Sequence, residues 1–192
     1  MKKPQEWEKI APALPGEFQQ LPPGGYVCVI NNAHVLNSQS GKEMLVLELD
    51  VAEGEYKYFF DKQFKANTFE PKKWPCVYYQ MTEGNSQRYF KGLITSIEKS
   101  NSGYTWDWDE QTLRGKLIGM LFQRTEYFAS TSGDYKWNVK PMAPRSVDKI
   151  RSGEFKVPED KPATNKPTNV NGKSTTENVN NIPDDYEDDL PF

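Results

Sequence analysis

Hydrophobic and polar residues alternate early in the chain in the way that β-strands require. Residues 44–51 place one set of side chains on one face and a second set on the other, namely Leu45, Leu47, Leu49 and Val51 opposite Glu48 and Asp50. This period of two predicts a half-buried strand. A β-rich run at 26–36 precedes it, and the turn residues 38–41 separate the two. Glu53-Gly54 then predicts a hairpin turn into a third strand at 56–60.

The period changes to that of a helix after residue 85. Asn85 or Ser86 can cap it, and Asn101-Ser102-Gly103 can end it. An apolar stripe of helical spacing lies between these signals and consists of Tyr89, Phe90, Leu93, Ile94 and Ile97. The pattern further predicts strands at 117–128 and 135–139, joined by the polar loop 130–134, and a short helix at 146–150.

The order of these elements is three strands, one helix and two strands. This order is typical of the OB-fold, a mainly β, five-stranded Greek-key barrel with its helix between strands 3 and 4. An SH3-like barrel lacks the central helix, and a parallel βαβ sheet needs more helices. The sequence therefore predicts an OB-fold domain.

Charge and aromatic content divide the 192 residues into two parts. Residues 1–157 hold 21 Lys and Arg, 19 Asp and Glu, and 23 of the 25 aromatic residues, whereas residues 158–192 hold 3 bases and 8 acids. A stretch with so few apolar side chains cannot offset its chain entropy by burial. We expect an N-terminal arm at 1–24, either packed over the barrel or loose, an OB-fold domain at 25–157, a disordered linker at 158–183 and an acidic tip at 184–192.

Several protein classes conflict with the composition. No window holds the roughly 18 consecutive apolar residues of a membrane helix, and the charged N-terminus is unlike a secretory signal. Two cysteines and one histidine cannot make a disulfide framework or a four-ligand Cys/His zinc site. We expect a cytoplasmic protein without a membrane partner, metal or cofactor.

The last nine residues combine carboxylates with an apolar end. They are Asp184, Asp185, Tyr186, Glu187, Asp188, Asp189, Leu190, Pro191 and Phe192. A solubilising acidic tail would explain the carboxylates but not the apolar Leu-Pro-Phe terminus. A docking motif explains both, because a terminal ring can fill a pocket while the carboxylates meet a basic rim.

The ending Asp-Asp-Leu-Pro-Phe resembles the acidic tip of bacterial single-stranded DNA-binding proteins, which usually end Asp-Asp-Ile-Pro-Phe; Leu190 replaces the Ile. The stretches 41–50 and 115–119 make the domain similar to single-stranded DNA-binding proteins of phages and mobile elements of Gram-positive hosts. The resemblance implies an OB-fold that binds single-stranded DNA. It also implies a tip that recruits replication, recombination and repair enzymes, with Asp184, Asp185, Asp188, Asp189, Leu190, Pro191 and Phe192 as its docking residues.

Binding of unpaired strands requires rings that stack on bases and cations that follow the phosphates. Both kinds of residue gather in the second hairpin strand, in two loops and in the last hairpin. The candidate DNA-binding residues are Tyr56, Lys57, Tyr58, Phe59, Lys62, Lys65, Lys72, Lys73, Trp74, Trp106, Arg124, Tyr127, Tyr135, Lys136, Trp137 and Lys140. The pattern leaves open which of these rings belong to the core.

Other functions have weaker support in the sequence. Asp107, Asp109 and Glu110 are the carboxylates that a two-metal nuclease would need, but an acidic loop with helix-capping residues explains them as well. No nucleophile–histidine arrangement or phosphate-binding loop is evident, so we expect a protein without catalytic activity. The main alternative is a recombination-mediator or protein-interaction module that uses the tail. The sequence leaves the oligomeric state open.

Overall fold

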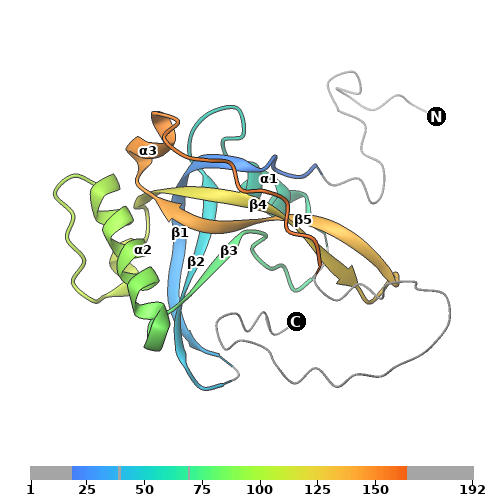
Figure 1. Ribbon diagram of the computed structural model, residues 1–192, viewed down its shortest axis with the longest axis horizontal. Helices are drawn as coiled ribbons and strands as arrows, with labels where there is room; N and C mark the ends of the chain where they lie inside the picture. Colours follow the sequence, from blue (N-terminus) through green and yellow to red (C-terminus); the bar gives the residue numbers. More distant parts are fainter. Residues whose placement is uncertain (1–18, 39, 69, 164–192) are drawn as a thin grey trace.

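The computed structural model describes residues 19–38, 40–68 and 70–163, which form a mainly β domain with few helices (Figure 1). The strands are β1 (Gly24–Asn37), β2 (Glu43–Val51), β3 (Val77–Met81), β4 (Leu117–Ala129) and β5 (Asp134–Arg145). The helices are α1 (Phe59–Ala66), α2 (Gln87–Ser100) and α3 (Val147–Arg151), with two 3₁₀ turns, η2 (Gly84–Ser86) and η3 (Glu110–Leu113).

All five strands join one antiparallel sheet in the order β3-β2-β1-β4-β5. β1 is the central strand, with Ile30 opposite Leu49 of β2 and Cys28 opposite Ile118 of β4. The predicted strands at 26–36, 44–51, 117–128 and 135–139 and both predicted helices are confirmed, and β5 is longer than expected. β2 is buried on both faces rather than half-buried, because Met44 and Val46 are buried as well.

The core lies on one face of the sheet, where the alternation of β2 places Leu45, Leu47, Leu49 and Val51. α2 adds the buried side chains Phe90, Leu93, Ile94 and Ile97. Tyr89 was predicted to lie in this apolar stripe, but it is 53% exposed and stacks with Arg88 instead. Cys28 belongs to the core, and burial raises the pKa of its thiol.

The prediction of a third strand at 56–60 is wrong. Residues 55–58 form a turn, α1 begins at Phe59, and the third strand is β3. The buried carboxylate of Asp50 on β2 accepts hydrogen bonds from the backbone N–H of Phe60 (2.9 Å) and of Val51 (2.8 Å). Asp50 thereby satisfies one of the unpaired N–H donors in the first turn of α1. The strand prediction failed because it used only neighbouring residues, and these do not show a helix cap that comes from β2.

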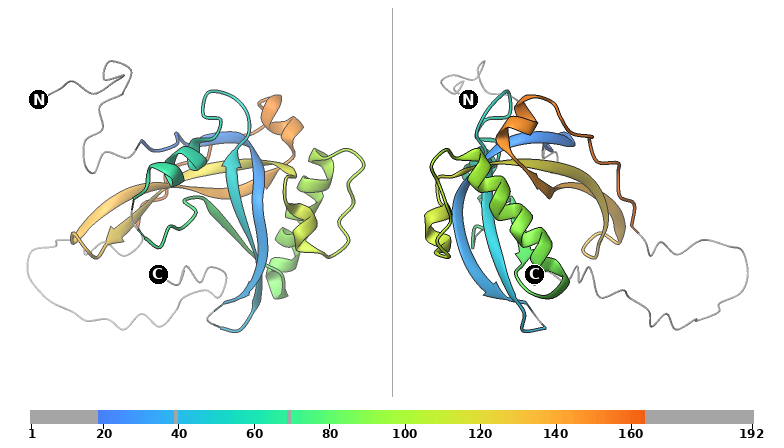
Figure 2. Two further views of the ribbon diagram at one scale, coloured as in Figure 1. Left: turned by 180° about the vertical axis from the view of Figure 1, so that it is seen from behind. Right: turned by 60° about the vertical axis from the view of Figure 1, so that its left-hand side comes forward.

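The outer face of the β1–β4 pair is covered by α3 and the residues that follow it (Figures 1 and 2). Small residues make room for them, because a Cβ on Gly119 would lie 2.6 Å from Ile150 and one on Gly25 would lie 2.6 Å from the Phe155 ring. Val27 and Leu121, on the same face, are buried. This covering buries apolar side chains on a second face of the sheet.

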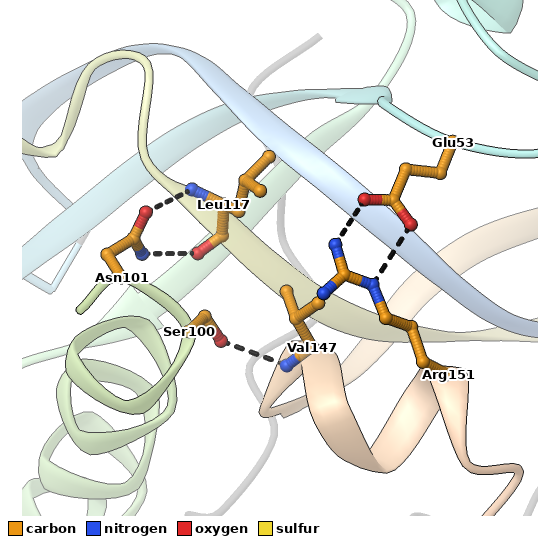
Figure 3. A network of polar contacts seen from close by, with 6 residues as sticks. All are labelled: Glu53, Ser100, Asn101, Leu117, Val147 and Arg151. Carbon is orange, nitrogen blue, oxygen red and sulfur yellow. Dashed lines mark hydrogen bonds and ion pairs between the residues drawn. The ribbon is translucent and has the colours of Figure 1, made fainter.

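Polar contacts fix α3 in place (Figure 3). Arg151 forms a two-point ion pair with Glu53, and the Ser100 hydroxyl at the end of α2 accepts a hydrogen bond from the Val147 N–H (3.0 Å). Asn101 acts like one residue of a strand, because its amide pairs with both the N–H (3.0 Å) and the C=O (2.8 Å) of Leu117. The C-terminal part of the domain is therefore tied to α2 and to the β2–α1 connection.

Candidate nucleic-acid interface

The β4–β5 hairpin reaches beyond the rest of the sheet (Figures 1 and 2). Pairing between β1 and β4 ends at Gly24 and Phe122, whereas β4 and β5 stay paired as far as Ala129 and Asp134. Residues 123–129 of β4 and their partners on β5 therefore form a two-stranded extension. Successive side chains on each strand point to opposite faces, so this extension presents two different surfaces.

One face of the extension carries three rings, an arginine and the buried Glu126, which lies opposite Trp137. We call its residues Arg124, Phe128, Tyr135 and Trp137 the aromatic face. The Arg124 guanidinium lies 4.6 Å from the centre of the Trp137 ring. Phe128 and Tyr135 meet edge to face at 5.3 Å, and Phe128 is 56% exposed. Val139, on the same face, packs against the core. The aromatic face is thus continuous with the core and leaves it as the hairpin extends.

The opposite face of the extension is polar and basic. Tyr127 is 42% exposed and lies opposite the exposed Lys136, while Gln123 lies opposite Lys140. Most rings therefore lie on one side of the hairpin and the ammonium groups on the other. The hairpin carries six of the predicted DNA-binding residues, with Arg124, Tyr135 and Trp137 on the aromatic face and Tyr127, Lys136 and Lys140 on the opposite face.

A second aromatic group lies between α1 and β3. Phe64 and Trp74 pack at 5.3 Å, and the Lys72 ammonium lies 5.8 Å from the Phe64 ring centre. The Trp74 indole donates a hydrogen bond to the Leu49 carbonyl (2.8 Å), which holds the half-buried ring in one position. Lys73 is exposed beside it.

Residues at the N-terminal end of the described chain connect these two groups. The Gln63 side chain on α1 donates a hydrogen bond to the Gln19 carbonyl (2.9 Å), and the Gln20 side chain donates one to the Trp137 carbonyl (2.7 Å). α1 and the middle of β5 therefore flank the same short segment. Of the predicted N-terminal arm, residues 1–18 lie outside the described residues.

The remaining residues predicted on the second hairpin strand divide between core and surface. Phe59 is 9% exposed and belongs to the core, and Tyr56 packs against that core. Tyr58 is 50% exposed, with the Lys57 ammonium 4.9 Å from its ring centre. Lys62 is exposed on α1, and Lys65 forms an ion pair with Asp61 (2.7 Å).

Acidic residues from the predicted linker lie against the hairpin. Lys161 forms a parallel β-bridge with Thr125, with its N–H donating to the Arg124 carbonyl (2.8 Å) and its C=O accepting from the Glu126 N–H (2.9 Å). Asp160 forms an ion pair with Arg124 at 3.3 Å. We call residues 159–163 the strap. The linker is predicted to start at 158, but its first residues are bound to the edge of β4, and no sequence pattern indicated this.

Two sets of predicted residues are not part of this surface. Trp106 lies in the connection between α2 and η3, at the end of the domain opposite the β4–β5 turn (Figures 1 and 2). The docking residues of the acidic tip, from Asp184 to Phe192, lie outside the described residues. Phe64 and Phe128 lie in the same ring-rich stretches as the candidates, and each contacts one of them, Trp74 and Tyr135 respectively.

No family model and no curated protein matches this chain. None of the helices in the described ranges is both long and apolar enough to cross a membrane. Across the same ranges, no group of three or more His, Cys, Asp and Glu side chains is placed to hold a metal ion.

Proposed function

We propose that this protein binds single-stranded DNA without sequence choice and without catalysing a reaction, in replication, recombination or repair of bacterial or phage DNA. The observation that carries the proposal is the aromatic face, where Arg124 covers one side of Trp137, and the exposed Phe128 and the half-buried Tyr135 follow along the hairpin. Accessible rings suit every base, because every base has a π-face, and a cation next to a ring suits the phosphate of the stacked nucleotide.

We further propose that the five strands close into an OB-fold barrel. Two features support this: the sheet order β3-β2-β1-β4-β5 and the position of α2 between β3 and β4 in the chain. In such a barrel the β4–β5 hairpin borders the surface used for oligonucleotides. α1 and the middle of β5 flank the segment Gln19–Gln20, which supports the proposal that both aromatic groups border one binding surface.

The test is a titration with poly-dT that follows tryptophan fluorescence at two salt concentrations. Trp137→Ala removes one stacking ring and the support of Arg124. We expect a loss of affinity of about 5- to 150-fold, which corresponds to about 1–3 kcal/mol for one stacked base. Trp108→Ala is the matched control, because Trp108 is 78% exposed on the α2–η3 connection. Equal affinities of wild type and Trp137→Ala, or no binding of wild type at low salt, would refute the proposal.

We propose that the acidic tip recruits partner enzymes. Its support is the sequence alone, in which Leu190, Pro191 and Phe192 follow a run of acids. Deleting Phe192 should abolish binding of tip-reading replication or repair enzymes while leaving poly-dT affinity unchanged. A co-sedimentation assay with such an enzyme measures the first effect, and undiminished binding would show that the tip is not the docking element.

A further inference from the structure

A pair of tryptophans lies on the connection between α2 and η3. Trp108 is 78% exposed, and its ring centre lies 4.7 Å from that of Trp106 with 38° between the planes. Trp106 rests edge-on against the core residue Phe90 at 5.5 Å. Trp106 therefore supports Trp108, and Trp108 presents its free face to solvent.

The connection holds this ring in place through its own hydrogen bonds. The backbone N–H of Trp106 donates a hydrogen bond to the Glu98 carboxylate (3.1 Å), and the backbone N–H of Gln111 donates one to the Asp109 carboxylate (2.9 Å). The Gln111 side chain donates to the Ala33 carbonyl (3.1 Å), which ties η3 to β1. Trp108 itself has a φ of 71°, a conformation that residues with a Cβ rarely adopt. Trp108 packs on Trp106 but leaves most of its ring in water, and a large exposed ring held by a well-bonded loop points to contact with another molecule.

Charge decides which kind of molecule fits. Three acids and no base lie between Lys99 and Arg114, and two of these acids, Asp107 and Asp109, flank Trp108 directly. Both carboxylates are exposed, and neither is in an ion pair with any residue of the described part of the chain. The negative charge of these carboxylates repels phosphates and attracts cations. A guanidinium or ammonium group also binds the face of an indole ring.

We propose that the Trp106–Trp108 pair with Asp107 and Asp109 is a docking site for an Arg- or Lys-bearing segment of a partner protein. It is separate from the nucleic-acid interface, because the α2–η3 connection and the β4–β5 turn lie at opposite ends of the domain (Figures 1 and 2). The cation of the partner stacks on the free face of Trp108, and the two carboxylates balance its charge. Bound DNA leaves this end accessible.

The test follows the indole N–H resonances of the ¹⁵N-labelled full-length protein, with Trp108 assigned from Trp108→Phe. Separate titrations use hexa-arginine, hexa-glutamate and oligo-dT. We expect hexa-arginine to shift the Trp108 resonance in a saturable way and hexa-glutamate to leave it in place. Oligo-dT should shift the Trp137 resonance and not that of Trp108.

Two double variants separate the local carboxylates from general charge. Asp107→Asn with Asp109→Asn keeps both acceptor oxygens of the loop and should abolish the hexa-arginine shift. Asp148→Asn with Glu154→Gln removes the same charge on and just after α3 and should preserve it. An unmoved Trp108 in the hexa-arginine titration, an equal shift in the loop variant, or a Trp108 shift with oligo-dT each overturns the proposal. Failure of oligo-dT to move Trp137 would count against the proposed DNA binding alone.

Discussion

Gly119 gives a direct test of how α3 packs on the outside of the sheet. A methyl group in Gly119→Ala would lie 2.6 Å from a side-chain carbon of Ile150, 2.8 Å from the Ser146 carbonyl oxygen and 2.9 Å from the Arg145 carbonyl oxygen. Real Cβ atoms do not approach other atoms so closely. Since two of these three atoms belong to the backbone at the β5–α3 junction, a change of rotamer cannot relieve the overlap.

The expected cost follows from overpacking in a filled interior, which is about 1–3 kcal/mol and reaches the upper end where backbone must move. We therefore expect Gly119→Ala to lower the free energy of unfolding by about 3 kcal/mol, a fall in Tm of about 10 °C for a domain of this size. Urea unfolding followed by tryptophan fluorescence, together with a thermal melt, measures both quantities.

The same substitution elsewhere supplies the control. Gly92 lies in the interior of α2, and a Cβ there would meet nothing within 4 Å. Gly92→Ala should stabilise the domain by about 0.5–1 kcal/mol, because alanine loses less backbone entropy in a helix. Combining Gly119→Ala with Ile150→Ala should not restore stability, since the two carbonyls remain. If Gly119→Ala melts at the temperature of wild type, α3 does not pack against β4 as described.

Two further predictions concern charged groups. Asp160→Asn removes the ion pair between the strap and Arg124. This pair is exposed, with 3.3 Å between its atoms, and stabilises the contact by at most about 1 kcal/mol. Poly-dT affinity should therefore rise about two- to five-fold at low salt and be unchanged at high salt; a rise that persists at high salt, or one equalled by Asp148→Asn, would contradict this. Burial raises the pKa of the Asp50 carboxyl above its ordinary value. The carboxyl therefore contributes its full stabilisation at a pH below the ordinary pKa, and this stabilisation is lost as the pH rises through the raised pKa. Asp50→Asn keeps an acceptor but cannot ionise, so the stability of wild type relative to this variant should fall with rising pH in urea unfolding; a difference independent of pH would show that Asp50 does not titrate in this way.

The strands that the sequence predicts correctly are those whose signal is local. β2 alternates along its own length, and α2 carries an apolar stripe of helical spacing, although the predicted cap Ser86 makes no side-chain hydrogen bond to the helix. The third strand was misplaced because Tyr56–Phe60 has as much β-propensity as Val77–Tyr79. The choice between them depends on Asp50, which bonds the first turn of α1 from a neighbouring strand.

The candidate site divides in the same way. Alternation along 135–140 indicates correctly that Trp137 lies on the face opposite Lys136 and Lys140. The core position of Phe59 and the anchoring of Trp74 by the Leu49 carbonyl both depend on strand pairings distant in sequence. The binding of the strap was even harder to predict from the sequence, because an acidic segment that contains proline has no strand pattern of its own. It is bound because residues 123–129 of β4 lie beyond the end of β1, and an edge of unpaired backbone groups accepts any extended segment within reach.

The distribution of charge limits how strongly the proposed DNA binding can depend on salt. Residues 55–74 and 123–140, which carry the two aromatic groups, hold eight bases and five acids, whereas the α2–η3 connection holds only acids. Lys65 and Arg124 already have carboxylate partners in Asp61 and Asp160. A phosphate that displaces such a carboxylate exchanges one anion for another, so these two cations add little to the counterions released on binding. At most six bases then contribute, and the slope of log affinity against log salt should not exceed roughly −4 in magnitude for a single strand. In the proposed binding mode, the affinity that remains at high salt comes from ring stacking.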